Sequence, residues 1–455
     1  MSRERLGSRL GFILLSAGCA IGIGNVWKFP WMVGQNGGGI FVLIYFFFLI
    51  ILGVPVMTME FSIGRAAQKS TAQMYKQLEP QGTKWHLQGY SAVAGNYILM
   101  MFYTTVAGWM LQYFVSMASG KLNVTASAAS EAVHDEMLLD PVTMMLFTFI
   151  VIAIGFTVCS FSLQKGLERV TKYMMTALIV IMVVLAVNSC FTKGGAEGLK
   201  FYLLPSVSRM KEVGIGNVIV SAMNQAFFTL SLGIGSMAIF GSYLSKDRAL
   251  LGEAVNISVL DTFVAVTSGL IIFPACMAYD IPVDAGPSLI FVTLPTMFGH
   301  LPLGRLWGSL FFVFMSFAAL STVLTVFENI VACFMDMFNW SRKKSCLING
   351  IAMAVLSLPC VFGFNIWSGF TPFGNGSNFM DLEDFLVSNI LLPLGSLCYV
   401  LFCTTKRGWG WKSFTAEANI GKGLKVAGWM RFYMTFILPL IILALFVLGL
   451  VMKFK

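Results

Sequence analysis

The chain has 455 residues, of which 57% are hydrophobic, 14% aromatic and only 11% charged. Soluble proteins carry about 25% charged residues, so most of this chain cannot face water and no room remains for a separate soluble enzyme domain. The net charge of +9 at pH 7 is spread over short segments between apolar runs, so it does not indicate nucleic-acid binding and no nucleic-acid partner is expected.

Apolar runs of about 20 residues predict membrane-spanning helices, and eleven such runs follow one another along the chain. They cover residues 11–33, 40–61, 90–118, 143–161, 173–191, 218–240, 254–277, 306–338, 346–364, 385–403 and 432–451. The predicted fold class is therefore an all-α integral membrane protein, with residues 1–455 forming a single transmembrane domain in the lipid bilayer.

Most of the 30 Lys and Arg residues lie in the N-terminal segment and in alternate loops. The positive-inside rule places these segments in the cytoplasm, and an odd number of spans then places the C-terminus outside. We therefore expect a multi-pass protein of the cell membrane with a cytoplasmic N-terminus and an extracellular C-terminus.

Nine cysteines and three histidines are present, without a C-x-x-C or H-E-x-x-H spacing. Disulfides and zinc sites are therefore not expected. The histidines His86, His134 and His300 lie in loops or at span ends, so no catalytic constellation is apparent and the chain is not predicted to be an enzyme.

The first predicted span contains the sequence AGCAIGIGNVWKFPW (residues 17–31), in which glycines, an asparagine and a lysine interrupt the apolar run. Such a sequence predicts a broken helix, whose free N–H and carbonyl groups suit a carboxylate and a desolvated sodium ion. Close packing of helices through small residues is the alternative.

A weak echo of this motif, SLGIGSMA (residues 231–238), lies in the sixth span. An offset of five spans inverts the second copy relative to the first, as in transporters with inverted repeats. We predict one repeat over about residues 9–191, a second over about 214–403, and an extra span over about 429–452.

Charged residues inside predicted spans indicate functional positions, because burying a charge in the bilayer is unfavourable. Asp261 lies deep in the seventh span, and Glu60 and Glu328 lie in the second and eighth. Structural hydrogen bonding to neighbouring helices is the simpler interpretation of the two glutamates. Lys28 and Asp384 lie at similar depths and suggest an ion pair, unless Lys28 snorkels to the interface.

Four motifs together resemble the neurotransmitter:sodium symporters, in particular the bacterial eleven-helix amino-acid transporters. They are SRLGF…GNVWKFP…NGGG (residues 8–39), QAFFTLSLGIG (225–235), FAALST (317–322) and DFLVSNILLPLG (384–395). The resemblance implies a five-plus-five inverted repeat with broken helices 1 and 6, plus an eleventh span. It also implies sodium-coupled amino-acid symport by alternating access.

The resemblance implies two sodium sites built from hard oxygen donors. The first would use the carbonyl of Ala20 and the side chains of Asn25, Thr229 and Asp261, together with the substrate carboxylate. The second would use the carbonyls of Gly18, Ile21 and Ala318 and the hydroxyls of Ser321 and Thr322.

The resemblance also implies the substrate site and two gates. The substrate-binding residues would be Ala20, Gly24, Leu99, Tyr103, Phe228, Thr229, Ser231, Ile234 and Val326. The outer gate would consist of Lys28, Tyr103, Gln225, Phe228 and Asp384, and the inner gate of Arg3 paired with Asp336, with Ser242 and Tyr243 beside them.

Four positions depart from the family pattern. Lys28 stands where the family usually has arginine, Leu6 where it commonly has tryptophan, and Thr176 where many bacterial members have proline. Asp261 replaces the asparagine of chloride-dependent animal members. A fixed carboxylate there would substitute for chloride, so transport is expected to be independent of chloride.

The expected substrate is a neutral, hydrophobic or aromatic L-amino acid, because the predicted side-chain pocket contains no acidic or basic residue. One or two sodium ions would be coupled to its uptake, and a monomer would suffice for function, whatever the oligomeric state. An amino-acid sensor on the same fold, with little transport, is the alternative; a passive channel is disfavoured by the paired breaks.

Overall fold

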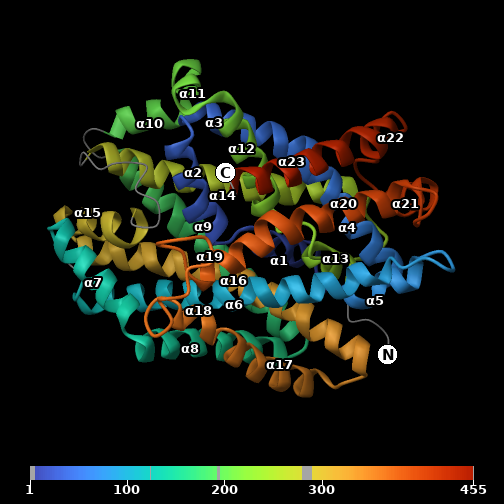
Figure 1. Cartoon of the computed structure of the whole chain (residues 1–455), viewed down its shortest axis with the longest axis horizontal. Helices are drawn as coiled ribbons and strands as arrows, with labels where there is room; N and C mark the ends of the chain where they lie inside the picture. Colours follow the sequence, from blue (N-terminus) through green and yellow to red (C-terminus); the bar gives the residue numbers. More distant parts are fainter. Residues whose placement is uncertain (1–5, 123, 192–194, 279–288, 454–455) are drawn as a thin grey trace.

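The computed structural model describes residues 6–122, 124–191, 195–278 and 289–453, and within them the regular secondary structure is helical, with only two isolated bridges outside it. Figure 1 shows the helices packed side by side, most of them running along the long axis of the molecule. Some spans contain a wider π-helical turn, labelled η.

The first half of the chain forms the following elements: α1 (Arg9–Ala20), η1 (Gly24–Lys28), α2 (Phe29–Gln35), α3 (Gly39–Phe48), η2 (Leu49–Gly53), α4 (Val54–Ala67), α5 (Thr71–Leu78), α6 (His86–Ser119), α7 (Ser127–Leu139), α8 (Pro141–Ser160), η3 (Gln164–Glu168), α9 (Arg169–Cys190), α10 (Gly195–Leu203) and α11 (Val207–Val213).

The second half forms α12 (Ile215–Thr229), α13 (Ser236–Gly241), α14 (Leu250–Ala278), η4 (Leu289–Thr293), α15 (Leu294–His300), α16 (Gly304–Phe338), α17 (Arg342–Leu356), α18 (Leu358–Phe362), α19 (Phe379–Phe385), η5 (Leu386–Leu391), α20 (Leu392–Thr404), α21 (Trp411–Ala418), α22 (Met430–Phe432), η6 (Tyr433–Ile437) and α23 (Leu438–Lys453).

Within the described residues, nine helices are long and apolar enough to cross a membrane. A tenth span is formed by Arg9–Ala20 and Gly24–Gln35, which are bent by 57° at a short break. The sixth predicted span is divided into α12 and α13, each too short to cross alone. The all-helical membrane fold is confirmed. The total of eleven spans remains a prediction, because it requires that α12 and α13 together form one span.

The first span breaks where the sequence predicts. Helix α1 ends at Ala20, Ile21 adopts an extended conformation with φ −75° and ψ 92°, and a π-helical turn begins at Gly24. At Gly22 the backbone of the break lies very close to two other spans, because a Cβ there would overlap the hydroxyl groups of both Tyr103 and Thr322. A side chain at this position would therefore separate the break from the two neighbouring spans.

The sixth span is interrupted between α12 and α13. Ser231, Gly233 and Gly235 have φ angles of 49°, 97° and 76°, and glycine reaches this left-handed region without the steric cost that other residues meet. Such a backbone leaves polar groups unpaired, and in a membrane each must find a partner.

Neighbouring helices supply those partners. Glu60 of α4 accepts a hydrogen bond of 2.6 Å from the N–H of Gly233, and Gln88 of α6 donates to the Gly233 carbonyl at 3.3 Å. Asn96 donates to the Ile234 carbonyl at 2.8 Å, and Thr71 to the Gly235 carbonyl at 3.0 Å. The structural interpretation of Glu60 fits this arrangement, since its carboxylate stabilises the break.

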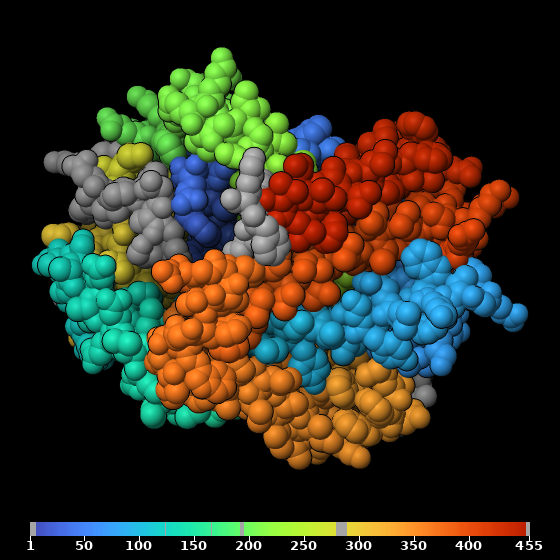
Figure 2. Space-filling model, in the orientation of Figure 1, coloured from blue at the N-terminus to red at the C-terminus, as the bar shows by residue number. Residues whose placement is uncertain are grey.

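The two breaks lie in the interior. In the most apolar 18-residue segment of each span, 78% of the residues are buried in α16 and 67% in α6 and α14, but only 28% in the last span. Figure 2 shows the later spans, in orange and red, beside the light-blue α5–α6 segment on one face. Dark-blue atoms of the early chain lie in a recess between the green α10–α11 region and the orange α18–α19 region.

Candidate functional site

Asp261 is the centre of the first predicted sodium site. Its carboxylate is buried on α14 and accepts hydrogen bonds from Asn25 Nδ2 at 2.8 Å, Thr229 Oγ1 at 3.2 Å and Tyr45 OH at 3.5 Å. The structure thus brings three predicted residues together from spans one, six and seven. Tyr45, on span two, was not anticipated.

The second predicted site lies at the other side of the break in span one. Ser321 Oγ lies within hydrogen-bond distance of two carbonyl oxygens, that of Ile21 at 3.1 Å and that of Ala318 at 2.9 Å. Thr322 Oγ1 donates to the Gly18 carbonyl at 3.4 Å. All five predicted groups are therefore adjacent, and their oxygen atoms are the hard donors that suit an alkali cation.

A small central cavity lies beside these two clusters. Eight predicted substrate residues line it: Ala20, Gly24, Leu99, Tyr103, Phe228, Thr229, Ser231 and Ile234. Val326, the ninth, is buried on α16 but is not among the lining residues. Cys19, Gly22, Thr322, Val387 and Leu392 line the cavity without having been predicted to bind substrate.

Tyr103 joins the cavity to the break in span one. Its hydroxyl accepts a hydrogen bond of 2.9 Å from the N–H of Ile23. That contact uses an acceptor position of the hydroxyl, and the Thr322 hydroxyl is a second hydrogen-bond partner. Ser231 links the two breaks directly, since its hydroxyl donates to the Cys19 carbonyl at 3.4 Å.

A second and larger cavity lies on the predicted extracellular side between span one and α19. Gly24, Tyr103 and Phe228 line both cavities and therefore separate them. This second cavity corresponds to the vestibule in front of the predicted outer gate.

The predicted gate residues meet at this boundary. Lys28 Nζ lies 3.7 Å from Asp384 Oδ2 and 3.8 Å from the centroid of the Phe228 ring. Gln225 lies deeper, where its Nε2 donates to the Gly24 carbonyl at 3.1 Å. The structure thus joins Lys28 to both Asp384 and Phe228, and the contact with the aromatic ring was not anticipated.

On the predicted cytoplasmic side, Arg3 of the predicted inner gate lies outside the described residues. Asp336 accepts a hydrogen bond of 2.6 Å from the N–H of Ser70. Ser242 donates to the Ile239 carbonyl at 2.6 Å, and Tyr243 donates to Glu328 at 2.8 Å. The pairing of Arg3 with Asp336 stays a prediction.

The N-terminal half of span one is attached to two neighbouring spans on this side. Glu168 accepts hydrogen bonds from the N–H of Gly7 at 2.8 Å and the hydroxyl of Ser8 at 3.0 Å. Arg9 Nη2 lies 2.9 Å from Glu253 Oε1. Leu6 borders a cavity on this side together with Phe12 and Tyr243.

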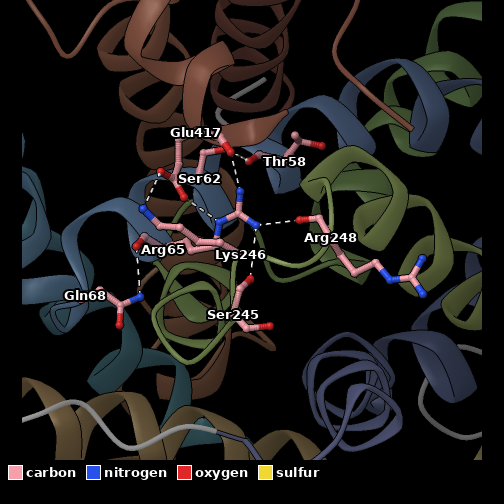
Figure 3. A network of polar contacts seen from close by, with 8 residues as sticks. All are labelled: Thr58, Ser62, Arg65, Gln68, Ser245, Lys246, Arg248 and Glu417. Carbon is pink, nitrogen blue, oxygen red and sulfur yellow. Dashed lines mark hydrogen bonds and ion pairs between the residues drawn. The ribbon is translucent and has the colours of Figure 1, made fainter. Parts of the chain in front are cut away.

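Arg65 forms a further polar network on this side (Figure 3). Its Nε lies 2.6 Å from Glu417 Oε1, and its Nη1 donates to the Arg248 carbonyl at 2.7 Å. Lys246 Nζ lies 3.6 Å from the second carboxylate oxygen of Glu417. This network connects three elements, namely span two, α21 and the loop that follows α13. It was not predicted from the sequence.

The comparisons with known proteins agree with this architecture. The family model described as the sodium:neurotransmitter symporter family matches residues 3–139 and 138–455. The chain therefore belongs to the sodium:neurotransmitter symporter family. As a member, it is a sodium-dependent transporter and not an enzyme.

Individual relatives of this symporter extend over nearly its whole length. An uncharacterised sodium-dependent transporter of Bacillus subtilis, YhdH, is 35% identical over 442 residues, 96% of each chain. One of Methanocaldococcus jannaschii is 31% identical over 463 residues, covering 98% of this chain and 90% of the relative. The crystal structure of MhsT in complex with L-phenylalanine has a TM-score of 0.88 and 35% identity, covering 98% and 100% of the two chains.

The His, Cys, Asp and Glu side chains in the described part of this symporter form no group of three or more that would hold a metal ion. The residues missed by sequence reasoning share one property, which is that they contribute through contacts between distant spans.

Proposed function

We propose that this chain is a sodium-coupled symporter that imports a neutral, hydrophobic or aromatic L-amino acid across the cell membrane by alternating access. The observation that carries the proposal is the central cavity, which lies between two clusters of oxygen donors and two helix breaks. One or two sodium ions would enter as cargo with the amino acid, and a monomer would suffice.

The cavity suits a zwitterion with an apolar side chain. Gly24 and the Tyr103 hydroxyl offer hydrogen-bond donors to a carboxylate, and the carbonyls near Ala20 and Ser231 offer acceptors to an ammonium group. Leu99, Phe228 and Ile234 supply apolar surface, and none of the lining residues is acidic or basic. The occurrence of L-phenylalanine in the MhsT crystal structure supports this substrate class.

Asp261 supports the proposal that chloride is not required. Its carboxylate supplies a fixed negative charge next to Asn25 and Thr229, so no anion need enter to balance the sodium ion. We also propose that the N-terminus is cytoplasmic and the C-terminus extracellular, as the distribution of Lys and Arg indicates.

The test is a thermal-stabilisation screen of the purified protein with each of the twenty common L-amino acids, in sodium and in potassium. We expect stabilisation by hydrophobic or aromatic amino acids in sodium only, because a ligand that binds the native state raises its melting temperature. Asp261→Ala should remove the sodium-dependent part of the shift.

Uptake into proteoliposomes separates the symporter from the alternative, an amino-acid sensor on the same fold. An imposed inward sodium gradient should drive accumulation of the stabilising amino acid above its outside concentration. Binding without such flux would favour the sensor, and equal stabilisation in potassium and sodium would contradict sodium coupling.

A further inference from the structure

Span ten contains a π-helical turn, η5 (Leu386–Leu391), between α19 and α20. Its hydrogen bonding includes a bond from the N–H of Leu392 to the carbonyl of Val387, five residues earlier. Single π turns inside α-helices are rare and occur frequently at functional sites, because they change which side chains share a face. In span ten this change affects the relative directions of the Val387 and Leu392 side chains.

In a regular α-helix with 3.6 residues per turn, side chains five positions apart point about 140° away from each other. A π-helix closes each turn with the fifth following residue, so residues i and i+5 come onto nearly the same face. Val387 and Leu392 are such a pair, and both line the central cavity. A regular helix through this segment would direct one of them elsewhere.

Span ten also touches the break in span six directly. A Cβ on Gly233 would come within 3.0 Å of Leu392 Cα, so the two backbones are in contact there. Ile234 follows Gly233 directly in the chain and lines the cavity together with Leu392. Leu99, Ile234, Val387 and Leu392 are all apolar and all line the same cavity.

We propose that the π-helical turn of span ten closes the side-chain end of the substrate pocket, and that Val387 and Leu392 set the size of the amino-acid side chain that fits. This inference rests on the proposed function, since it concerns the same cavity. Span ten would then determine which amino-acid side chains are accepted. Its Val387 lies three residues after Asp384 of the predicted outer gate.

The chain offers a matched control. Val323 of span eight and Val387 of span ten are the same residue type, and both are 0% exposed. Val387 lines the cavity, whereas Val323 packs against α8, where a Cβ on Gly155 would lie 3.2 Å from Val323 Cγ1. Truncating either valine to alanine therefore removes the same buried atoms, but only one truncation enlarges the pocket.

The experiment measures the sodium-dependent affinities of the full-length protein for L-tryptophan and L-leucine. A methylene-sized change in an apolar pocket alters discrimination by about tenfold or more. We expect Val387→Ala to raise the affinity ratio of tryptophan to leucine about tenfold, and Val387→Ile to lower it. Leu392→Ala should act in the same direction as Val387→Ala, and Val323→Ala should leave the ratio unchanged.

An unchanged ratio in the folded Val387 variants, or an equal shift in Val323→Ala, would overturn the inference. Having one enlarging and one reducing variant at position 387 keeps the test decisive if one of them fails to fold. The proposed function is tested separately by the wild-type protein: without sodium-dependent binding of any amino acid, both proposals fail. If the wild type binds and the ratio does not respond, only the inference fails.

Discussion

Lys28 Nζ lies 3.8 Å above the centre of the Phe228 ring, at the boundary between the vestibule and the central cavity. The same ammonium group lies 3.7 Å from Asp384 Oδ2. Lysine lacks the planar fork that lets arginine bind a carboxylate through two parallel hydrogen bonds. In this symporter the cation is instead shared between a carboxylate and an aromatic face.

This sharing predicts how Lys28 and Asp384 of the predicted outer gate each contribute to holding bound amino acid. Replacing Lys28 with methionine removes both contacts, and we expect dissociation of bound amino acid to become about five- to tenfold faster, equivalent to about 1 kcal/mol. Asp384→Asn should have a smaller effect, because the ion pair is partly exposed and such pairs contribute about 0.2–1 kcal/mol. Dissociation of radiolabelled amino acid into excess unlabelled ligand measures both rates, and an equal or larger effect of Asp384→Asn would contradict the role of Phe228.

Asp261 predicts the response to chloride. We expect the wild-type protein to transport equally in sodium chloride and sodium gluconate, since the carboxylate already supplies the negative charge. Asp261→Asn should lower sodium affinity and make the remaining uptake dependent on chloride. Asp247→Asn is the control, because Asp247 is exposed and hydrogen-bonds Ser245. A steep chloride requirement of the wild type at constant sodium would refute this prediction.

The Arg65 network predicts a large loss of stability from a single change. Breaking a buried ion pair by removing one partner costs about 3–5 kcal/mol, since the other charge remains buried. We therefore expect Arg65→Met to lower the melting temperature strongly and Lys246→Met to change it little, because the Lys246 side chain is 62% exposed. Thermal unfolding in detergent without substrate measures both melting temperatures. A melting temperature of Arg65→Met as high as that of Lys246→Met and of the wild type would show that the network is dispensable.

His134 predicts a pH dependence of stability on the predicted extracellular side. Its ring stacks on Phe291 with centroids 5.2 Å apart, and its Nδ1 lies 3.0 Å from the Tyr113 hydroxyl. Burial lowers the pKa of His134, a shift that the nearby Asp135 carboxylate opposes only in part. The folded protein therefore binds this proton at lower pH than the unfolded chain does.

Because the unfolded chain takes up the proton first, stability falls as the pH drops below about 6.5, the usual histidine value. The fall continues until His134 in the folded state becomes protonated. His134→Gln should make the melting temperature less sensitive to pH between about 6.5 and 5. A variant whose pH profile matches that of the wild type would remove His134 from this role.

Much of the fold and many of the candidate site residues were predictable from the sequence. Apolar runs of the right length indicated the spans, because a membrane-embedded backbone must be helical. The interruption around residues 20–28 marked the first break, since glycine and polar residues in such a run are unfavourable without a cavity. Asp261 stood out for the same reason, and the structure places it beside Asn25 and Thr229.

Only the tertiary structure decided which distant groups meet. The contact of Lys28 with Phe228, the cap that Glu60 provides for Gly233, and the link between Arg65 and Glu417 each join residues far apart in the chain. The contact between Leu392 of span ten and Gly233 of span six, and the cavity that both Val387 and Leu392 line, likewise arise only from the packing of the spans. Local sequence sets where a helix can form and break, but the partners of its polar groups and the face it presents are chosen by the packing of all the spans together.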